Sequence, residues 1–144
     1  MKKTFKGRAV ISGTATLKAL VTHEGFNTLA SYKNCKDGYN VCTDQNNKEL
    51  YGKSTVGVAL CLPQTIGSTT GGMVLFNSAV IGCNPGALLF SKKIDSLAAA
   101  GAILASVWTP NVIPTVDDLG DEFLDYVKDG MTIEIAPDGT VTAE

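Results

Sequence analysis

The chain has 144 residues, 44% of them hydrophobic and 18% charged, a balance that predicts a folded protein with one domain over residues 1–144. Because the net charge is -2 and Lys and Arg are not clustered, we do not expect the protein to bind nucleic acid. The longest helix-length apolar stretch, residues 97–108, is shorter than the roughly 20 residues that span a bilayer, so we expect no membrane span and a cytoplasmic protein.

The first predicted elements are β-strands. Residues 7–11 form a short apolar strand, Ser12 and Gly13 form a turn, and residues 15–21 carry apolar side chains at alternate positions, as in a second strand. Residues 23–52 are rich in Asn, Asp, Lys, Gly and Tyr and follow no period, which predicts a long loop holding short strands. Loops of that length in compact domains tend to be functional.

The middle of the chain alternates between strand and helix patterns. A buried strand over 54–62 is followed by a glycine-rich loop and a helix over 73–80. A short strand over 87–90 then precedes an alanine-rich helix over 95–108, with Asp95 or Ser96 as its N-cap. This order implies parallel pairing of the strands.

The last third of the chain predicts one more helix and a hairpin. Asp117 and Asp118 are candidate caps for a helix that runs through Phe123 and ends at Gly130. Residues 131–136 and 140–142 alternate around Pro137-Asp138-Gly139, a signal typical of a β-hairpin. The fold class is therefore α/β, with hairpins at both ends of the chain around a βαβα middle.

Four cysteines match neither a metal knuckle nor a small disulfide scaffold, since their separations are 7, 19 and 22 residues. We expect reduced thiols. Cys61 lies in an apolar run and should be buried, whereas Cys35 and Cys42 flank a polar stretch and should be more exposed.

The segment Gly67-Ser68-Thr69-Thr70-Gly71-Gly72 has the composition of a ligand-binding loop. Its glycines allow sharp turns, and its hydroxyl residues stand where a helix exposes its first N–H groups. A helix start carries about half a positive charge, which favours an anionic ligand and a developing serine alkoxide. Ser68 is therefore a candidate general base, although an unassisted serine is weak at neutral pH.

A structural role for the same loop stays open, because one of its hydroxyls could cap the helix while Gly71 and Gly72 allow close packing. Known motifs do not fit: no Lys follows the glycines as in a Walker loop, and the frames of a dinucleotide site and of a nucleophile elbow are absent. A serine hydrolase would need the only histidine, His23, which is expected to be a surface residue.

The sequence resembles the swivel domain of aconitase X. The resemblance rests on residues 63–75 around the glycine-rich loop, with 50–52 before them and 94–101 after them. It also takes in residues 7–13 and 130–135, so it covers nearly the whole chain except 23–49. It implies a single swivelling β/β/α domain of the aconitase swivel type.

The resemblance also assigns roles to residues. Ser68, directly after the glycine, would be the general base, and Gly67, Thr69 and Thr70 would hold substrate oxygens. Independently of the resemblance, Asp95 and Ser96 start the second helix and could reach the same pocket, because successive strand–helix loops open at the same sheet edge, although we favour helix capping as their role. The arginine that follows in ordinary aconitases is replaced here by Thr70 and Gly71, so a tricarboxylate substrate is not expected.

By the same resemblance, a larger subunit would carry an iron–sulfur cluster and most of the substrate pocket, so this chain would bind no metal and act only in a heteromer. The implied reaction is dehydration of a β-hydroxy carboxylate. The substrates implied by the family are cis-3-hydroxy-L-proline, which we favour because residues 64–66, directly before Gly67, include no basic residue, and mevalonate 5-phosphate. A non-catalytic anion-binding or regulatory module and a phosphohistidine carrier are the alternatives of other classes.

Overall fold

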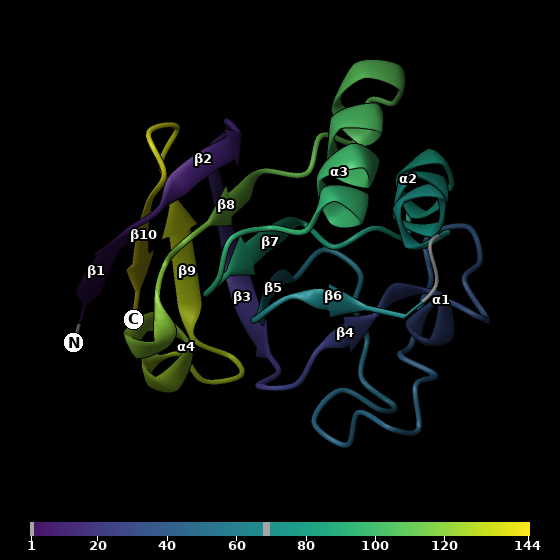
Figure 1. Ribbon diagram of the computed structural model, residues 1–144, viewed down its shortest axis with the longest axis horizontal. Helices are drawn as coiled ribbons and strands as arrows, with labels where there is room; N and C mark the ends of the chain where they lie inside the picture. The colour runs from purple at the N-terminus through teal and green to yellow at the C-terminus, as the bar shows by residue number, and fades with distance from the viewer. Residues whose placement is uncertain (1, 68–69) are drawn as a thin grey trace.

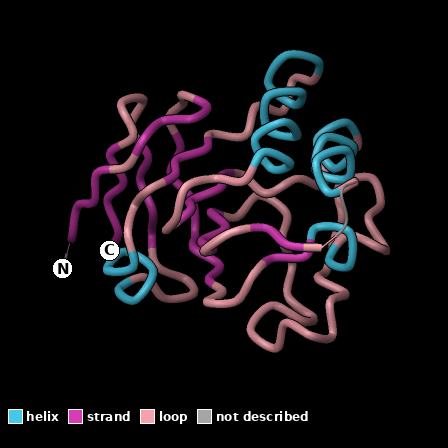
Figure 2. Tube along the Cα trace, viewed as in Figure 1, coloured by secondary structure: helices cyan, strands magenta, loops and turns pink. Residues whose placement is uncertain are grey.

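The computed structural model describes residues 2–67 and 70–144 (Figures 1 and 2). Within these residues, eight strands form one sheet in the order β1-β10-β9-β3-β5-β7-β8-β2, and β4 and β6 form a small second sheet. No helix in these ranges is both long and apolar enough to cross a bilayer. The strands are β1 Lys3–Lys6, β2 Arg8–Ile11, β3 Ala15–Val21, β4 Phe26–Asn27, β5 Ala59–Leu62, β6 Thr65–Ile66, β7 Ala87–Phe90, β8 Thr115–Asp117, β9 Thr132–Ile135 and β10 Thr140–Ala143. The helices are α1 Thr28–Ser31, α2 Gly71–Val80, α3 Ser96–Trp108 and α4 Asp121–Tyr126.

The sheet has a parallel and an antiparallel half. β3, β5, β7 and β8 are parallel neighbours, which confirms the pairing predicted from the strand–helix alternation. β9 and β10 form the predicted C-terminal hairpin, whose Gly139 has a φ of +90°.

The predicted N-terminal hairpin is wrong, because β2 and β3 do not pair. β3 lies between β5 and β9, and β2 instead pairs with β8. The reason is that β9 pairs with β3 over residues 15–18 and β5 pairs with it over 19–21, so β3 offers no edge to β2, which covers the free edge of β8.

Gly7 lies where the sheet curls towards closure. β1 and β2 stand at opposite ends of the strand order but are separated in the chain only by Gly7, so the first strands bring the two edges together (Figure 1). The Gly7 N–H donates to the Gly139 carbonyl oxygen at 3.0 Å. A Cβ at Gly7 would lie 2.6 Å from the Asp117 carbonyl oxygen, so no larger residue fits without movement.

Two apolar cores lie on the two faces of the sheet. One is enclosed by the curled sheet and α4, and its Phe5 and Phe123 rings meet edge to face with centroids 5.2 Å apart. The other lies under α2 and α3, which pack side by side on the outer face of the parallel strands (Figures 1 and 2). This arrangement places the starts of both long helices at one edge of the sheet.

Asp117 does not cap a helix as predicted. It is the last residue of β8, and α4 begins only at Asp121, after Gly120. The Asp117 carboxylate is buried and accepts hydrogen bonds from Arg8 Nε at 2.9 Å, Arg8 Nη2 at 2.6 Å and the Ile94 N–H at 2.8 Å. Burial alone would raise the pKa of Asp117, but these donors outweigh it and lower the pKa below its usual value. Asp117 therefore belongs to β8, where its carboxylate connects this strand to Arg8 of β2.

The cysteine predictions are corrected in two places. Cys35 and Cys83 form a disulfide that joins the long 23–52 segment to the chain after α2, although 48 positions separate them. Cys42 is buried, because the segment folds back over the core under α2. Cys61 is buried as predicted, and burial raises the pKa of its thiol.

Candidate functional site

Three of the predicted site residues come together in one pocket. Gly67, Asp95 and Ser96 line a cavity of about 170 Å³ between the end of β6 and the starts of α2 and α3. We call it the glycine-loop pocket; its other lining residues are Thr28, Thr65, Ile66, Gly71 and Leu97. Thr70 is at the N-cap of α2 and lines a neighbouring hollow with Lys33 and Met73. Ser68 and Thr69 lie outside the described residues.

Asp95 connects the start of α3 to β6 through its carboxylate. Its Oδ2 accepts the Ala98 N–H at 3.0 Å, which caps α3, and its Oδ1 accepts from the Thr65 N–H at 3.2 Å and Thr65 Oγ1 at 2.6 Å. The favoured capping role is therefore confirmed for Asp95. Because both carboxylate oxygens are engaged within the protein, Asp95 acts as a positioning residue that fixes α3 against β6.

Gly67 determines the direction in which the loop leaves β6. Its φ of +99° lies in the left-handed region, and a Cβ there would be 2.8 Å from Asn27 Cγ. Asn27 pairs in register with Ile66 and caps α1 through its Oδ1, which accepts the Ala30 N–H at 3.0 Å. Only glycine satisfies both the backbone conformation and this contact.

Gly72 and Gly101 bring the two long helices into close contact. A Cβ on Gly72 would lie 2.5 Å from the Leu97 carbonyl oxygen, and one on Gly101 would lie 2.6 Å from the Gly72 carbonyl oxygen. The helices therefore approach backbone to backbone, and their starts border the same pocket. The partly positive N–H groups at the start of α2 favour a carboxylate or another anion there, whereas the start of α3 is already capped by the Asp95 carboxylate.

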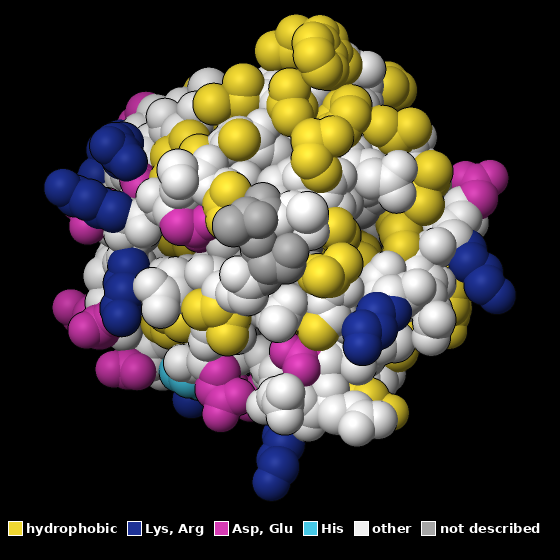
Figure 3. All heavy atoms as spheres, turned by 45° about the vertical axis from the view of Figure 1, so that its right-hand side comes forward, with side chains coloured by type: hydrophobic (Ala, Val, Ile, Leu, Met, Phe, Trp, Pro, Cys, Tyr) yellow, Lys and Arg dark blue, Asp and Glu magenta, His cyan; other side chains and the backbone are white. Residues whose placement is uncertain are grey.

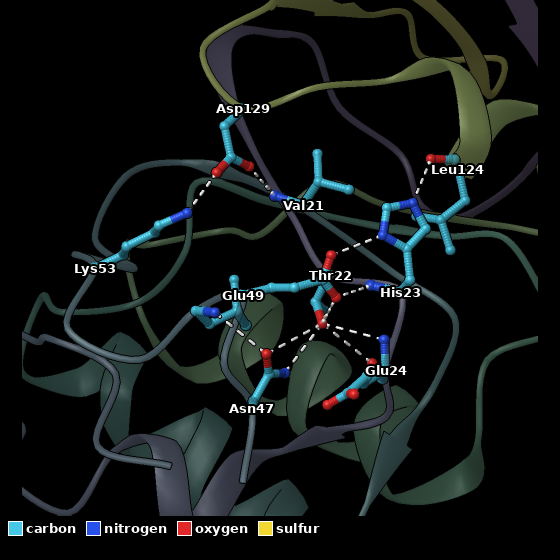
Figure 4. A network of polar contacts seen from close by, with 10 residues as sticks. Val21, Thr22, His23, Glu24, Asn47, Glu49, Lys53, Leu124 and Asp129 are labelled. Atoms are coloured by element: carbon cyan, nitrogen blue, oxygen red, sulfur yellow. Dashed lines mark hydrogen bonds and ion pairs between the residues drawn. The ribbon is translucent and has the colours of Figure 1, made fainter. Parts of the chain in front are cut away.

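A polar network around His23 was not predicted (Figure 4). The His23 ring lies between Glu49, with Nδ1 2.8 Å from Oε2, and the Leu124 carbonyl oxygen, 3.2 Å from Nε2. The hydrogen bond to Glu49 raises the pKa of His23. Burial would raise the pKa of Glu49, but its bonds with His23 and Thr22 lower it overall.

The same network continues to a second ion pair. Asp129 accepts the Val21 N–H at 2.7 Å and pairs with Lys53 at 2.7 Å (Figure 4). These contacts fasten the 23–52 segment to the end of β3 and to the chain after α4. No periodic pattern links His23 to Glu49 or Lys53 to Asp129, so the sequence carried no signal for them. His23 is also not among the described residues that line the glycine-loop pocket.

The described residues do not fit a metal or an iron–sulfur cluster. Within 2–67 and 70–144, no group of three or more His, Cys, Asp or Glu side chains gathers where it could hold a metal ion. Cys35 and Cys83 are bonded to each other, and Cys42 and Cys61 are buried.

Comparisons with known proteins agree with the fold. The aconitase X swivel domain family matches residues 4–143. The phosphomevalonate dehydratase small subunit of Methanothrix thermoacetophila is 34% identical, over 95% of this chain and 97% of that protein. The protein of the same name from Methanosarcina mazei is 29% identical, over 90% of this chain and 82% of that protein.

Solved structures point the same way. The holo-form crystal structure of Thermococcus kodakaraensis aconitase X superposes with a TM-score of 0.84 over 99% of this chain and 98% of that chain; at 24% identity this is a likeness of fold. A solution NMR structure of a UPF0107 protein gives a TM-score of 0.77 at 30% identity, over 96% of this chain and 97% of that chain. Because the family model spans residues 4–143, the chain belongs to the aconitase X swivel domain family.

Proposed function

We propose that this chain is the small subunit of an aconitase X-type dehydratase that acts on a β-hydroxy carboxylate together with a larger chain. The observation that carries the proposal is the glycine-loop pocket, where the starts of α2 and α3 converge beside Gly67, the residue that precedes Ser68 in the sequence. The relatives named as dehydratase small subunits support it, because this chain matches the first of them over nearly its whole length. The same proposal takes this chain to be a single domain that forms a cytoplasmic heteromer with the larger chain. It includes no nucleic acid and no membrane as a partner.

In the proposed mechanism, Ser68 is the base. The reaction removes a proton from the carbon next to the substrate carboxylate, forms the carbon–carbon double bond and releases the β-hydroxyl as water. Ser68 Oγ takes the proton and later returns it to solvent. The start of α2 stabilises the alkoxide form of this serine by its partial positive charge. Gly67, Thr69, Thr70 and Ser96 would bind substrate oxygens, and Asp95 would keep α3 aligned.

The departing hydroxyl needs an acid that Ser68 does not supply. Because the described residues hold no suitable ligand set, the iron–sulfur cluster of the family would be carried by the large subunit. When bound there, it would supply Lewis-acid chemistry at the hydroxyl. The chain would then be active only in the complex.

Two substrates are candidates. The relatives favour mevalonate 5-phosphate, and Lys33 lines the hollow next to Thr70, where its ammonium could meet a phosphate. The absence of a basic residue at 64–66 favoured cis-3-hydroxy-L-proline instead. Both are β-hydroxy carboxylates, so the proposed role of Ser68 is the same for either.

The test is reconstitution with the larger aconitase X-type chain of the same organism. Ser68→Ala should lower kcat by about 10²–10⁴-fold and stop exchange of the substrate α-proton with D₂O, while the complex still assembles. The matched control is Ser12→Ala, because Ser12 Oγ donates to the Pro137 carbonyl oxygen and Ser12 is not among the described residues that line the glycine-loop pocket, so turnover should be unchanged. Wild-type turnover in the Ser68→Ala complex would refute the mechanism. Anion binding without any turnover in the wild-type complex would favour the regulatory module.

A further inference from the structure

The outer face of the α2–α3 pair is apolar and exposed. Its side chains gather over the two helices in Figure 3. We call this surface the helix-pair face; it comprises Met73, Val80, Ile103, Val107 and Trp108, which are 58%, 54%, 47%, 67% and 70% exposed. Trp108 also meets Phe76 of α2 edge to face, with ring centroids 6.0 Å apart, so the two helices contribute to one surface.

The helix-pair face has no charge. All 26 Lys, Arg, Asp and Glu residues of the chain lie outside residues 71–91 and 96–116, which contain both helices. A helix that faces water on one side normally carries charged side chains there. Charge depletion with exposed Trp and Met is instead typical of the centre of a protein–protein interface.

The size of the helix-pair face also fits an interface. Side chains of this size at roughly half to two-thirds exposure present on the order of 500 Å² of apolar surface, near the upper end for a patch on a monomer. A standard interface buries about 800 Å² on each partner, so the face would supply its apolar centre and the surrounding loops its rim.

The helix-pair face is continuous with the proposed site. Met73 lines the hollow that Thr70 also lines, and the half-exposed Ile66 lines the glycine-loop pocket. A partner that covers α2 and α3 would therefore border this pocket and exclude water from it. We infer that the helix-pair face is the docking surface for the large subunit, an inference that rests on the proposed function.

The test measures the dissociation constant between this chain and the larger aconitase X-type chain of the same organism. Val107→Lys and Trp108→Ala should each weaken binding by about 30-fold or more, as expected for residues at the centre of an interface. Tyr51→Lys is the matched control, because Tyr51 is 51% exposed but lines a different hollow, together with Tyr39 and Val41. Circular dichroism should show that all three variants remain folded.

A second readout follows Trp108 directly. Because it is the only tryptophan of this chain, 5-fluorotryptophan labelling gives a single ¹⁹F resonance. Its relaxation by a soluble nitroxide should fall when the unlabelled large subunit is added. Unchanged relaxation in the complex, or wild-type affinity of both variants, would overturn the inference.

The remaining outcomes separate the two proposals. If Ser68→Ala turns over normally while Val107→Lys fails to bind, the docking surface stands and the catalytic role falls. If this chain alone forms a dimer that Trp108→Ala dissociates, and the large subunit binds that variant normally, the face belongs to a second copy and the inference is overturned. Failure of the wild-type chains to associate would overturn both.

Discussion

Two adjacent glycines at the start of α2 should respond to the same substitution in opposite directions. A Cβ on Gly71 would have its nearest neighbour, Thr28 Cβ, at 3.7 Å, which is ordinary van der Waals contact. A Cβ on Gly72 would lie 2.5 Å from the Leu97 carbonyl oxygen, so α2 and α3 would have to separate by nearly 1 Å. Gly71→Ala and Gly72→Ala therefore form a matched pair.

The expected magnitudes follow from backbone entropy and overpacking. Replacing Gly by Ala at a compatible position stabilises by about 0.4–1 kcal/mol, and this should be the whole effect for Gly71→Ala. Gly72→Ala should gain a similar amount of unfolding free energy but lose about 1–3 kcal/mol because the backbone is forced to move. Its net effect should therefore be a destabilisation of about 1 kcal/mol. The gap of about 2 kcal/mol corresponds to roughly 4–8 °C in Tm for a chain of this size.

Differential scanning calorimetry of the two variants measures this gap. In the reconstituted dehydratase, Gly72→Ala should also lower kcat by about 10²-fold, because a shift of about 1 Å at the helix start misplaces Ser68. A Gly72→Ala protein as stable as Gly71→Ala would show that the helices are not in backbone contact. Normal turnover in a destabilised Gly72→Ala complex would show that the helix start does not position the base.

The other predictions concern the polar ties that hold the segments together. Because the pKa of His23 is raised in the folded protein, protonated His23 contributes its full stabilisation below about pH 6.5, and this contribution is lost as the pH rises through the folded-state pKa. Because the pKa of Glu49 is lowered, ionised Glu49 contributes its stabilisation above about pH 4.5. The Tm difference between wild type and His23→Gln should therefore be largest between about pH 4.5 and 6.5, and a difference that does not vary with pH would contradict the ion pair. In Asp117→Asn, the new amide N–H would face the N–H donors of Arg8 or Ile94. The substitution should lower the free energy of unfolding by about 2 kcal/mol. This value is modest for the loss of charged hydrogen bonds, because the Arg8 side chain is 62% exposed. Because the pKa of Asp117 is lowered, urea denaturation should show the full loss of unfolding free energy at pH 7 and a smaller loss below about pH 4. Equal losses at the two pH values would contradict a stabilising role for the Asp117 carboxylate.

Local features of the fold could be predicted from the sequence. The strand over 87–90 was predicted with its observed bounds and the helix over 95–108 to within one residue, because an apolar run and a capping side chain act within a few residues. The partner of β2 could not be predicted. It depends on Arg8 reaching Asp117, 109 positions away, and no local pattern records such a contact.

The candidate site was predictable to a similar extent. Gly67, Asp95 and Ser96 were expected together, because consecutive strand–helix loops open at the same edge of a parallel sheet. The part played by Asn27 was not, since it lies in the 23–52 segment, which follows no period. The pairing of Cys35 with Cys83 escaped prediction because a separation of 48 positions matches no cysteine motif.

The split of the first strand pair around Gly7 bears on how the protein folds during translation. β1 pairs only with β10 among the described strands, with Phe5 opposite Val141, so its hydrogen bonds must wait until the last strand has been synthesised. The nascent chain can assemble the parallel strands earlier, with β1 still unpaired. Because such long-range pairing is slow, we expect the closing of the sheet to be the late step of folding.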